Sequence, residues 1–187
     1  YLVCNSNLLY HASVPLNEDG SFKHVRIGKK EYWGHKLLQK TDQLIRTAYF
    51  DEDGSAEKNF ALDYMWYMWC GPDAPSFDKD KMATFERYFI ADKALHKENK
   101  GYYYTLRNRA DICDNILAEF GVEPGPHSHI INGHVPVKTI KGERPIKADG
   151  KLLVIDGGFS KAYQPETGIA GYTLVYHSHG MQLVQHD

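Results

Sequence analysis

Short apolar runs bounded by turn residues lie near both ends of the 187-residue chain and predict β-strands there. Leu8-Leu9-Tyr10 follows the turn-like Asn5-Ser6-Asn7, and the β-branched pair Ile130-Ile131 runs into Asn132-Gly133. Two further runs are typical of strands: KLLVID at 151–156, and TLVYHSHGMQLVQ at 173–185, which predicts a hairpin that turns at His179-Gly180.

Apolar residues at helical spacing occupy the middle of the chain instead. Residues 32–50 place Trp33, Leu37 and Leu44 on one face and predict a helix that ends before Asp51. Three more helices are predicted over 58–69, 82–89 and 108–120, the last capped by Asn108 and stopped by Gly121. Helices between two groups of strands predict a mixed α/β (α+β) fold.

Aromatic residues are concentrated between residues 32 and 104, and the helix predicted at 58–69 carries them on every side. A helix that is apolar all round is usually buried or covered by a partner. The expectation here is a thick aromatic core, with a partner interface and a carbohydrate-stacking surface as the alternatives.

Length, charge and cysteine count narrow the class of protein. A chain of 187 residues corresponds to about one domain, 1–187, and its net charge of -2 with scattered Lys and Arg gives no nucleic-acid surface. No apolar run is long enough to span a membrane. The odd set of Cys4, Cys70 and Cys113, without CxxC spacing, indicates free thiols and a cytoplasmic protein. The apolar start and the stop after a strand suggest a piece of a larger protein.

Two histidines follow predicted strands directly and are the main candidates for chemistry. His11 comes after Leu8-Leu9-Tyr10, and His134 comes after Ile130-Ile131. Ligands bind at the strand ends of layered α/β proteins, so both are candidate metal ligands, with solvated loop histidines as the alternative. Gly133 would let the backbone approach a ligand or take a positive φ. Asp156 is either a carboxylate that orients one of these histidines or a turn residue.

Other polar groups give weaker signals. Two His-x-His pairs, His127 with His129 and His177 with His179, could bind metal or lie on the surface. Lys161 and Tyr163 are candidates for binding an anionic substrate, as are Lys138, Arg107 and Arg109. The chain has no P-loop, GxGxxG or GxSxG motif, and we assign no catalytic nucleophile, acid or base.

Four stretches together resemble one known family: NLLYHASVPLNEDGSF, MWYMWCGPDAPSFDKDKMATFERYFI, HIINGHVPVK and KLLVIDGGFSKAYQPETGIAGYTLVY. They are similar to the C-terminal part of the bacterial class 3 fructose-1,6-bisphosphatases, which belong to the calcineurin-like metallophosphoesterase superfamily. The resemblance spans the whole chain. It implies the C-terminal part of an αββα sandwich, with residues 28–120 as a helical, aromatic-rich insertion.

The resemblance also implies an activity and a metal. It implies a hydrolase of gluconeogenesis that converts fructose 1,6-bisphosphate to fructose 6-phosphate and phosphate, with a dinuclear Mn²⁺ centre. His11 and His134 match two histidine ligands of that centre. The position after the first histidine is Ala12 where the superfamily usually has glycine, and the early superfamily blocks DxH, GDxxDRG and GNHE are absent.

These departures lead to two expectations and two alternatives. The chain alone should lack useful phosphatase activity, and its uncovered sheet edges and apolar face should favour a homo-oligomer. One alternative is an oligomerisation or regulatory module without catalysis. The other is a phosphoesterase that acts on a different phosphoester. Convergence of His11 and His134 on one point would favour the enzyme over the module.

Overall fold

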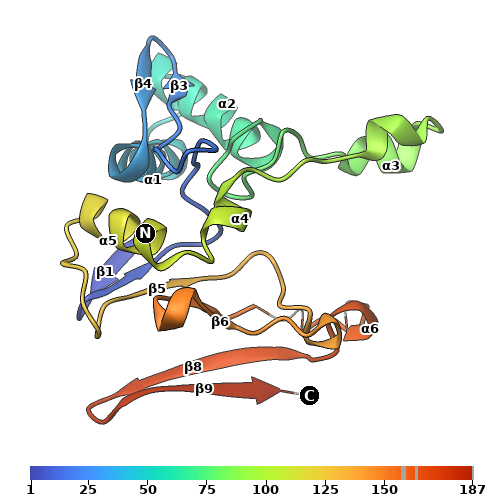
Figure 1. The fold of residues 1–187 in the computed structure, drawn as a ribbon. Coiled ribbons are helices and arrows are strands. Elements are labelled where there is room, and N and C mark those ends of the chain that lie inside the picture. Colours follow the sequence, from blue (N-terminus) through green and yellow to red (C-terminus); the bar gives the residue numbers. More distant parts are fainter. Residues whose placement is uncertain (157–158, 163, 187) are drawn as a thin grey trace. The chain divides into compact units, whose positions relative to one another are not determined.

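The computed structural model describes residues 1–156, 159–162 and 164–186, and within them the chain forms two compact units (Figure 1). The first unit comprises Tyr1 and residues 13–106. The second comprises residues 2–12 and the described part of 107–187. Helices and sheets occur together, so the predicted mixed α/β class is confirmed. The metallophosphoesterase sandwich and the boundaries of the insertion remain predictions.

The first unit is mainly helical. Its elements are β3 (Val25–Ile27), β4 (Lys30–Tyr32), α1 (Gly34–Phe50), α2 (Ala56–Cys70), α3 (Thr84–Phe89), a 3-10 helix at Lys93–His96 and α4 (Tyr103–Leu106). The predicted ends of α1 and α2, at Asp51 and Gly71, are confirmed. Ser55 caps α2 because its side chain accepts a hydrogen bond from the Lys58 amide.

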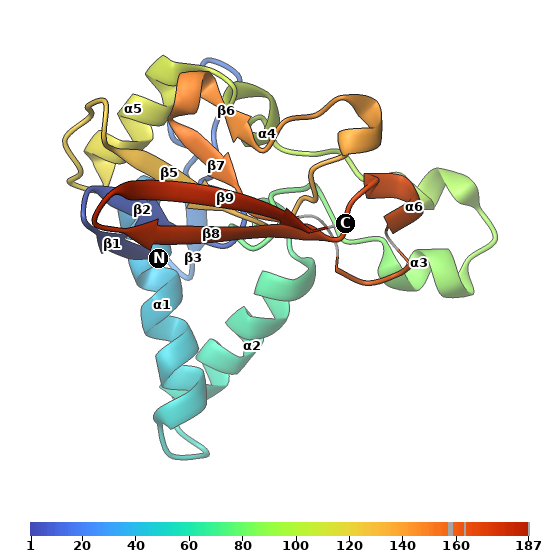
Figure 2. The same cartoon turned by 90° about the horizontal axis from the view of Figure 1, so that it is seen from below.

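The helices α1 and α2 form a hairpin (Figure 2). Leu37 and Leu44 are buried on α1, as the helical spacing predicted, and Leu38 is buried beside them. A buried hydrogen bond of 2.8 Å joins the Thr41 hydroxyl of α1 to the Tyr64 hydroxyl of α2. The helix pair is therefore held by one apolar stripe and one satisfied polar contact.

The expected aromatic core is only partly present. Tyr64 and Tyr103 are buried, but Trp66 is 60% exposed, and the rings of Trp66, Trp69 and Phe85 form a chain with centroids 5.0 and 5.3 Å apart. Among the described residues α2 is not buried all round, so that expectation was wrong, and the alternative of a covering partner remains a prediction. Within its unit, α1 packs along one side of α2, and Phe85 of α3 contacts Trp69 near the end of α2.

The second unit is built on a five-stranded sheet in the order β1-β2-β5-β7-β6. Its strands are β1 (Leu2–Cys4), β2 (Asn7–Leu9), β5 (His129–Asn132), β6 (Ile146–Lys147) and β7 (Leu152–Val154). The three central strands, β2, β5 and β7, run parallel, whereas β1 and β6 pair antiparallel at the edges. The central strands carry the buried aliphatic residues, which is typical of parallel strands.

The helix α5 (Ala110–Glu119) contacts β5 and buries Ile112, Ile116 and Leu117. It begins after Arg109, so the predicted Asn108 cap was wrong, and Arg109 makes no side-chain cap. The predicted stop is confirmed. Gly121 has a φ of 74°, and the Val122 amide donates to the Leu117 carbonyl at 2.9 Å, which closes a Schellman motif.

The rest of the second unit consists of short helices and a hairpin. These elements are 3-10 helices at Thr139–Lys141 and Ala148–Gly150, α6 (Gln164–Thr167), β8 (Gly171–His177) and β9 (Gly180–His186). The predicted hairpin is confirmed, although its two turn residues are Ser178 and His179, one position earlier than expected. The three cysteines are free thiols, as predicted.

Candidate functional site

The two candidate histidines extend from neighbouring parallel strands. Leu9 of β2 pairs with Ile131 of β5, and backbone hydrogen bonds continue past both strand ends. The Tyr10 amide donates to the Ile131 carbonyl at 3.2 Å, and the Gly133 amide donates to the His11 carbonyl at 2.8 Å. Because the strands are parallel and in register, both histidines leave the sheet at the same edge, the one formed by the C-terminal ends of the strands.

The two imidazole rings meet at that edge. Nε2 of His11 lies 3.1 Å from Nδ1 of His134, and the ring centroids are 5.0 Å apart. The predicted convergence of these residues is therefore confirmed as geometry. Two nitrogen ligands of one ion, each about 2.1 Å from it, lie roughly 3.0–3.4 Å apart. The spacing fits a shared metal ion as well as it fits a direct N–H···N hydrogen bond.

His134 has a strained backbone. Its φ is 67°, and the Val135 amide donates to the Gly133 carbonyl at 2.8 Å, which makes His134 the centre of a γ-turn with positive φ. Such turns are rare for non-glycine residues and cost about 1–3 kcal/mol, and they concentrate at functional sites. The positive φ expected for Gly133 is thus found at His134 instead.

Asn132 joins the two histidine-bearing loops, and the sequence did not reveal this role. Its side chain is 1% exposed, and its Nδ2 donates to the Ala12 carbonyl at 2.9 Å. In the sequence, Asn132 before Gly133 indicated only a turn. Its partner lies 120 positions away, so only the fold could show that it fixes the loop after His11 to the strand before His134.

Asp156 lies near the same edge of the sheet. A Cβ added to Gly133 would lie 3.6 Å from Asp156 Oδ2, and the Asp156 carbonyl accepts from the Val137 amide at 3.0 Å. The strand β7 ends at Val154, two residues earlier than expected. A carboxylate thus lies near Gly133, and its role in orienting a histidine remains a prediction.

Comparison with known proteins shows the family. The family model described as Firmicute fructose-1,6-bisphosphatase matches residues 1–187. The chain belongs to this fructose-1,6-bisphosphatase family. Proteins named fructose-1,6-bisphosphatase class 3 are 84% identical to it in Bacteroides fragilis, 82% in Bacteroides thetaiotaomicron and 60% in Clostridium novyi, each over all 187 residues. The chain spans 28% of the length of each of these relatives. No solved structure matches the chain.

This end of the parallel strands supplies two nitrogen donors to a candidate metal site. The described residues include no group of three or more His, Cys, Asp or Glu side chains arranged to hold a metal ion. His11 and His134 therefore form a pair of nitrogen donors that needs further ligands.

The anion-binding candidates have different surroundings. Lys161 is exposed in a turn, and no hydrogen bond or ion pair links it to His11 or His134 among the described residues. Tyr163 lies outside the described residues. The ammonium group of Lys138 is 3.9 Å from Glu166.

The two arginine candidates are less suited to anion binding in this fold. Arg107 is buried, whereas Arg109 is exposed and forms two hydrogen bonds to the Asp111 carboxylate, at 2.5 and 3.1 Å. A paired guanidinium is already neutralised, so we do not include Arg109 in the proposed site.

The two His-x-His pairs lie elsewhere in the second unit. His127 and His129 are at the start of β5, the opposite end from His134, and His177 and His179 flank the turn of the β8–β9 hairpin. His127, His129 and His177 line one pocket.

None of the helices in the described part of the chain is both long and apolar enough to cross a bilayer.

Proposed function

We propose that the full-length protein is a metal-dependent fructose-1,6-bisphosphatase that releases phosphate from fructose 1,6-bisphosphate and leaves fructose 6-phosphate. His11 and His134 would supply two ligands of a dinuclear Mn²⁺ centre. The observation that carries this proposal is the 3.1 Å approach of the two ring nitrogens in a chain of this family. Manganese, when bound, would polarise the phosphoryl oxygen and lower the pKa of an attacking water.

The chain's own residues hold and direct the nitrogen donors. An imidazole must be neutral at the ligating nitrogen, so both His11 Nε2 and His134 Nδ1 would have to carry a lone pair. The γ-turn directs His134, and the buried amide of Asn132 fixes the neighbouring loop at Ala12. Asp156 is proposed to orient a histidine from the same edge, as carboxylates do around metal ligands.

Substrate binding is proposed for Lys161 and Tyr163. Lys161 has an exposed ammonium group with no ion-pair partner among the described residues, so it is available to a phosphate group. We also propose that the protein acts in gluconeogenesis in the cytoplasm and belongs to the metallophosphoesterase superfamily. The resemblance of the GHVPVK and VIDGGFSKAYQ blocks and the three free thiols support these points.

The test is manganese-dependent phosphate release from fructose 1,6-bisphosphate by the full-length protein. We expect His11→Ala and His134→Ala to lower kcat/KM by more than about 100-fold, because even partners outside the ligand shell are worth 10–100-fold. Bound manganese should fall in parallel. His129→Ala, at the other end of β5, is the matched control and should keep both. The 187-residue chain alone should release no phosphate.

The alternative is an oligomerisation or regulatory module. The exposed chain of aromatic rings at Trp66, Trp69 and Phe85 is the observation that favours it, because a partner or a second copy could cover such a surface. Full activity and full metal content in both His11→Ala and His134→Ala would exclude the proposed site and favour this module.

A further inference from the structure

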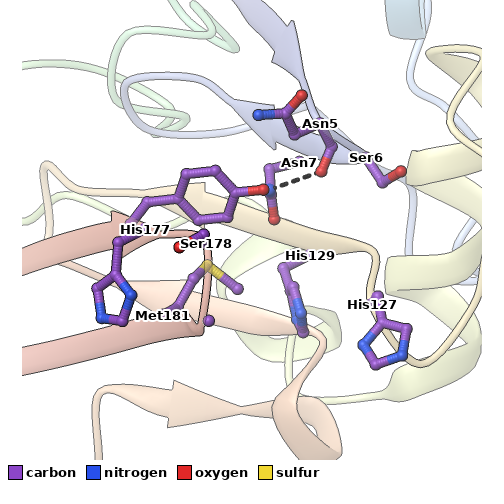
Figure 3. Close-up of a pocket in the computed structure, with 10 residues that line it drawn as sticks. Asn5, Ser6, Asn7, His127, His129, His177, Ser178 and Met181 are labelled. Atoms are coloured by element: carbon purple, nitrogen blue, oxygen red, sulfur yellow. Dashed lines mark hydrogen bonds between the residues drawn. The ribbon is translucent and has the colours of Figure 1, made fainter.

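A second polar site lies at the other end of the parallel strands. A pocket of about 660 Å³ is bounded by the turn between β1 and β2, the start of β5 and the turn between β8 and β9 (Figure 3). Pockets for small molecules typically measure 300–1,000 Å³. His11 and His134 follow the last residues of β2 and β5, whereas the pocket uses Asn7 and His129, the first residues of the same strands. The pocket is therefore separate from the proposed metal site.

Hydrogen bonds fix which nitrogens two of its imidazoles offer. His129 Nδ1 lies 2.9 Å from the Gly150 carbonyl, which can only accept, so Nδ1 carries the hydrogen and Nε2 is left as an acceptor. His177 Nδ1 accepts from the His179 amide at 3.1 Å, so the neutral ring carries its hydrogen on Nε2. These two rings thus offer the pocket one acceptor and one donor.

Asn7 brings a buried amide to the pocket wall. Its side chain lines the pocket and the residue is 5% exposed, and its Nδ2 donates to the Asn5 carbonyl at 2.9 Å (Figure 3). Its Oδ1 is buried and has no hydrogen-bond partner among the described residues. Because Oδ1 is closed to solvent, a ligand in the pocket does not reach it, and Asn7 contributes to the shape of the pocket wall.

The lining excludes two common classes of ligand. None of the described residues that line the pocket is Asp, Glu, Lys or Arg, so an anion would find no fixed positive charge. A metal ion would find no carboxylate, and no group of three metal-binding side chains exists among the described residues. Ser178 and Tyr176 add hydroxyl groups, and Met181 adds an apolar wall.

We propose that this pocket binds a neutral polyhydroxylated small molecule, a sugar or a polyol. Each hydroxyl of such a molecule both donates and accepts, which matches the acceptor His129 Nε2 and the donor His177 Nε2–H. Its C–H faces can pack against Tyr176 and Met181. The binding does not depend on the phosphatase proposal, because no residue is shared between the two sites.

The test is saturation-transfer difference NMR on the full-length protein with glucose and with sorbitol as probes. We expect a saturable signal from at least one of them. Ser178→Phe, at an exposed turn position, should fill the pocket and reduce the signal at least tenfold. Gln182→Phe is the matched control: it follows Met181 in β9 and points to the opposite face of the strand, so it should leave the signal unchanged.

Three outcomes would overturn the proposal. One is the absence of a saturable signal from both probes, and another is a signal that persists in Ser178→Phe. The third is a signal abolished by His134→Ala but not by Asn7→Leu, which would place the sugar at the proposed active site. A signal that survives His134→Ala and is lost in Ser178→Phe supports the pocket even if the phosphatase proposal fails.

Discussion

The two ends of the parallel strands β2 and β5 use the same residue types in different ways. At the C-terminal end, His11 and His134 contact each other, and Asn132 bonds to the loop that follows His11. At the N-terminal end, His129 bonds to a backbone carbonyl, and Asn7 bonds within its own turn. At the C-terminal end, therefore, side-chain contacts join the two loops. At the N-terminal end the side chains bond to nearby backbone, and His129 Nε2 is left for a ligand.

This difference shows that residue type alone does not decide the chemistry of a site. Two imidazoles whose nitrogens face each other at 3.1 Å suit a shared cation. Imidazoles whose hydrogens are fixed by backbone groups suit a ligand with hydroxyl groups. The hydrogen-bond partner of each ring, rather than the ring itself, separates the two ends.

The buried polar side chains at both strand ends, Asn7 and Asn132, are neutral amides. The largest expected effect on stability comes instead from a buried carboxyl group in the first unit. Asp78 is 1% exposed, and burial, with the nearby Asp73 charge, raises its pKa from 3.8 to about 7. The folded state therefore holds this proton up to about pH 7, while the unfolded state releases it near pH 4. Stability from this group is complete below pH 4 and falls by about 1.4 kcal/mol per pH unit up to about pH 7.

Asp78→Asn should remove this pH dependence. We expect the variant to gain roughly 4 kcal/mol relative to the original chain between pH 4 and pH 8. Urea unfolding of the 187-residue chain, followed by tryptophan fluorescence, measures it, because Trp33, Trp66 and Trp69 all lie in the first unit. Equal pH dependence with and without Asp78 would contradict the prediction.

Asp80→Asn is the matched control for Asp78. Burial acts to raise the pKa of Asp80, but hydrogen bonds from the Asn99 amide and side chain outweigh it and lower the pKa. The Asp80 carboxylate therefore stabilises the folded state above the pKa that it has in the unfolded chain. This stabilisation is lost as the pH falls through the lower pKa of the folded state. The control should therefore lose stability at pH 8, opposite in sign to Asp78→Asn.

The next prediction concerns the hydrogen bond that joins the two loops at the C-terminal end of the strands. Asn132→Leu keeps the approximate volume but removes the donor to the Ala12 carbonyl. In the full-length protein we expect manganese affinity and phosphate release to fall 10–100-fold, the usual cost of losing a partner that orients metal ligands. Metal titration followed by the electron paramagnetic resonance of free Mn²⁺ gives the affinity independently of activity.

Asn7→Leu is the control at the N-terminal end. It removes a part-buried side-chain bond, from Nδ2 to the Asn5 carbonyl, and should cost about 1–3 kcal/mol of stability. Manganese affinity and phosphate release should not change. If both leucine variants lose manganese equally, the two ends are not distinct, and Asn132 has only a general structural role.

The sequence predicted most elements that depend on local pattern. The end of α1 at Asp51, the Gly121 stop of α5 and the β8–β9 hairpin follow from spacing and turn residues within a few positions. The positions of His11 and His134 after strands were also predicted, because each follows an apolar run, but the parallel pairing of those strands was not. The Asn108 cap was wrong because several neighbouring positions can begin a helix, and local sequence does not rank them well.

Contacts between distant positions were not predictable. The bond from Asn132 to Ala12 and the bond from His129 to Gly150 join residues 120 and 21 positions apart. The exposure of Trp66 depends on how many elements surround α2, which its own periodicity does not specify. Sequence thus located the candidate ligands at the C-terminal end, but not the residue that joins their loops.

The smallest effect concerns Gly133, which precedes the strained His134. Its φ is not positive, and an added Cβ would meet Asp156 Oδ2 at 3.6 Å and the His11 carbonyl at 3.8 Å, both ordinary contacts. Gly133→Ala should therefore stabilise the chain by about 0.4–1 kcal/mol through the unfolded state and leave phosphate release by the full-length protein unchanged. Gly121→Ala, with a φ of 74°, should instead destabilise it by about 1–2 kcal/mol. Loss of phosphate release in a stable Gly133→Ala variant would mean that substrate approaches this backbone closely, and the C-terminal end would then bind substrate as well as metal.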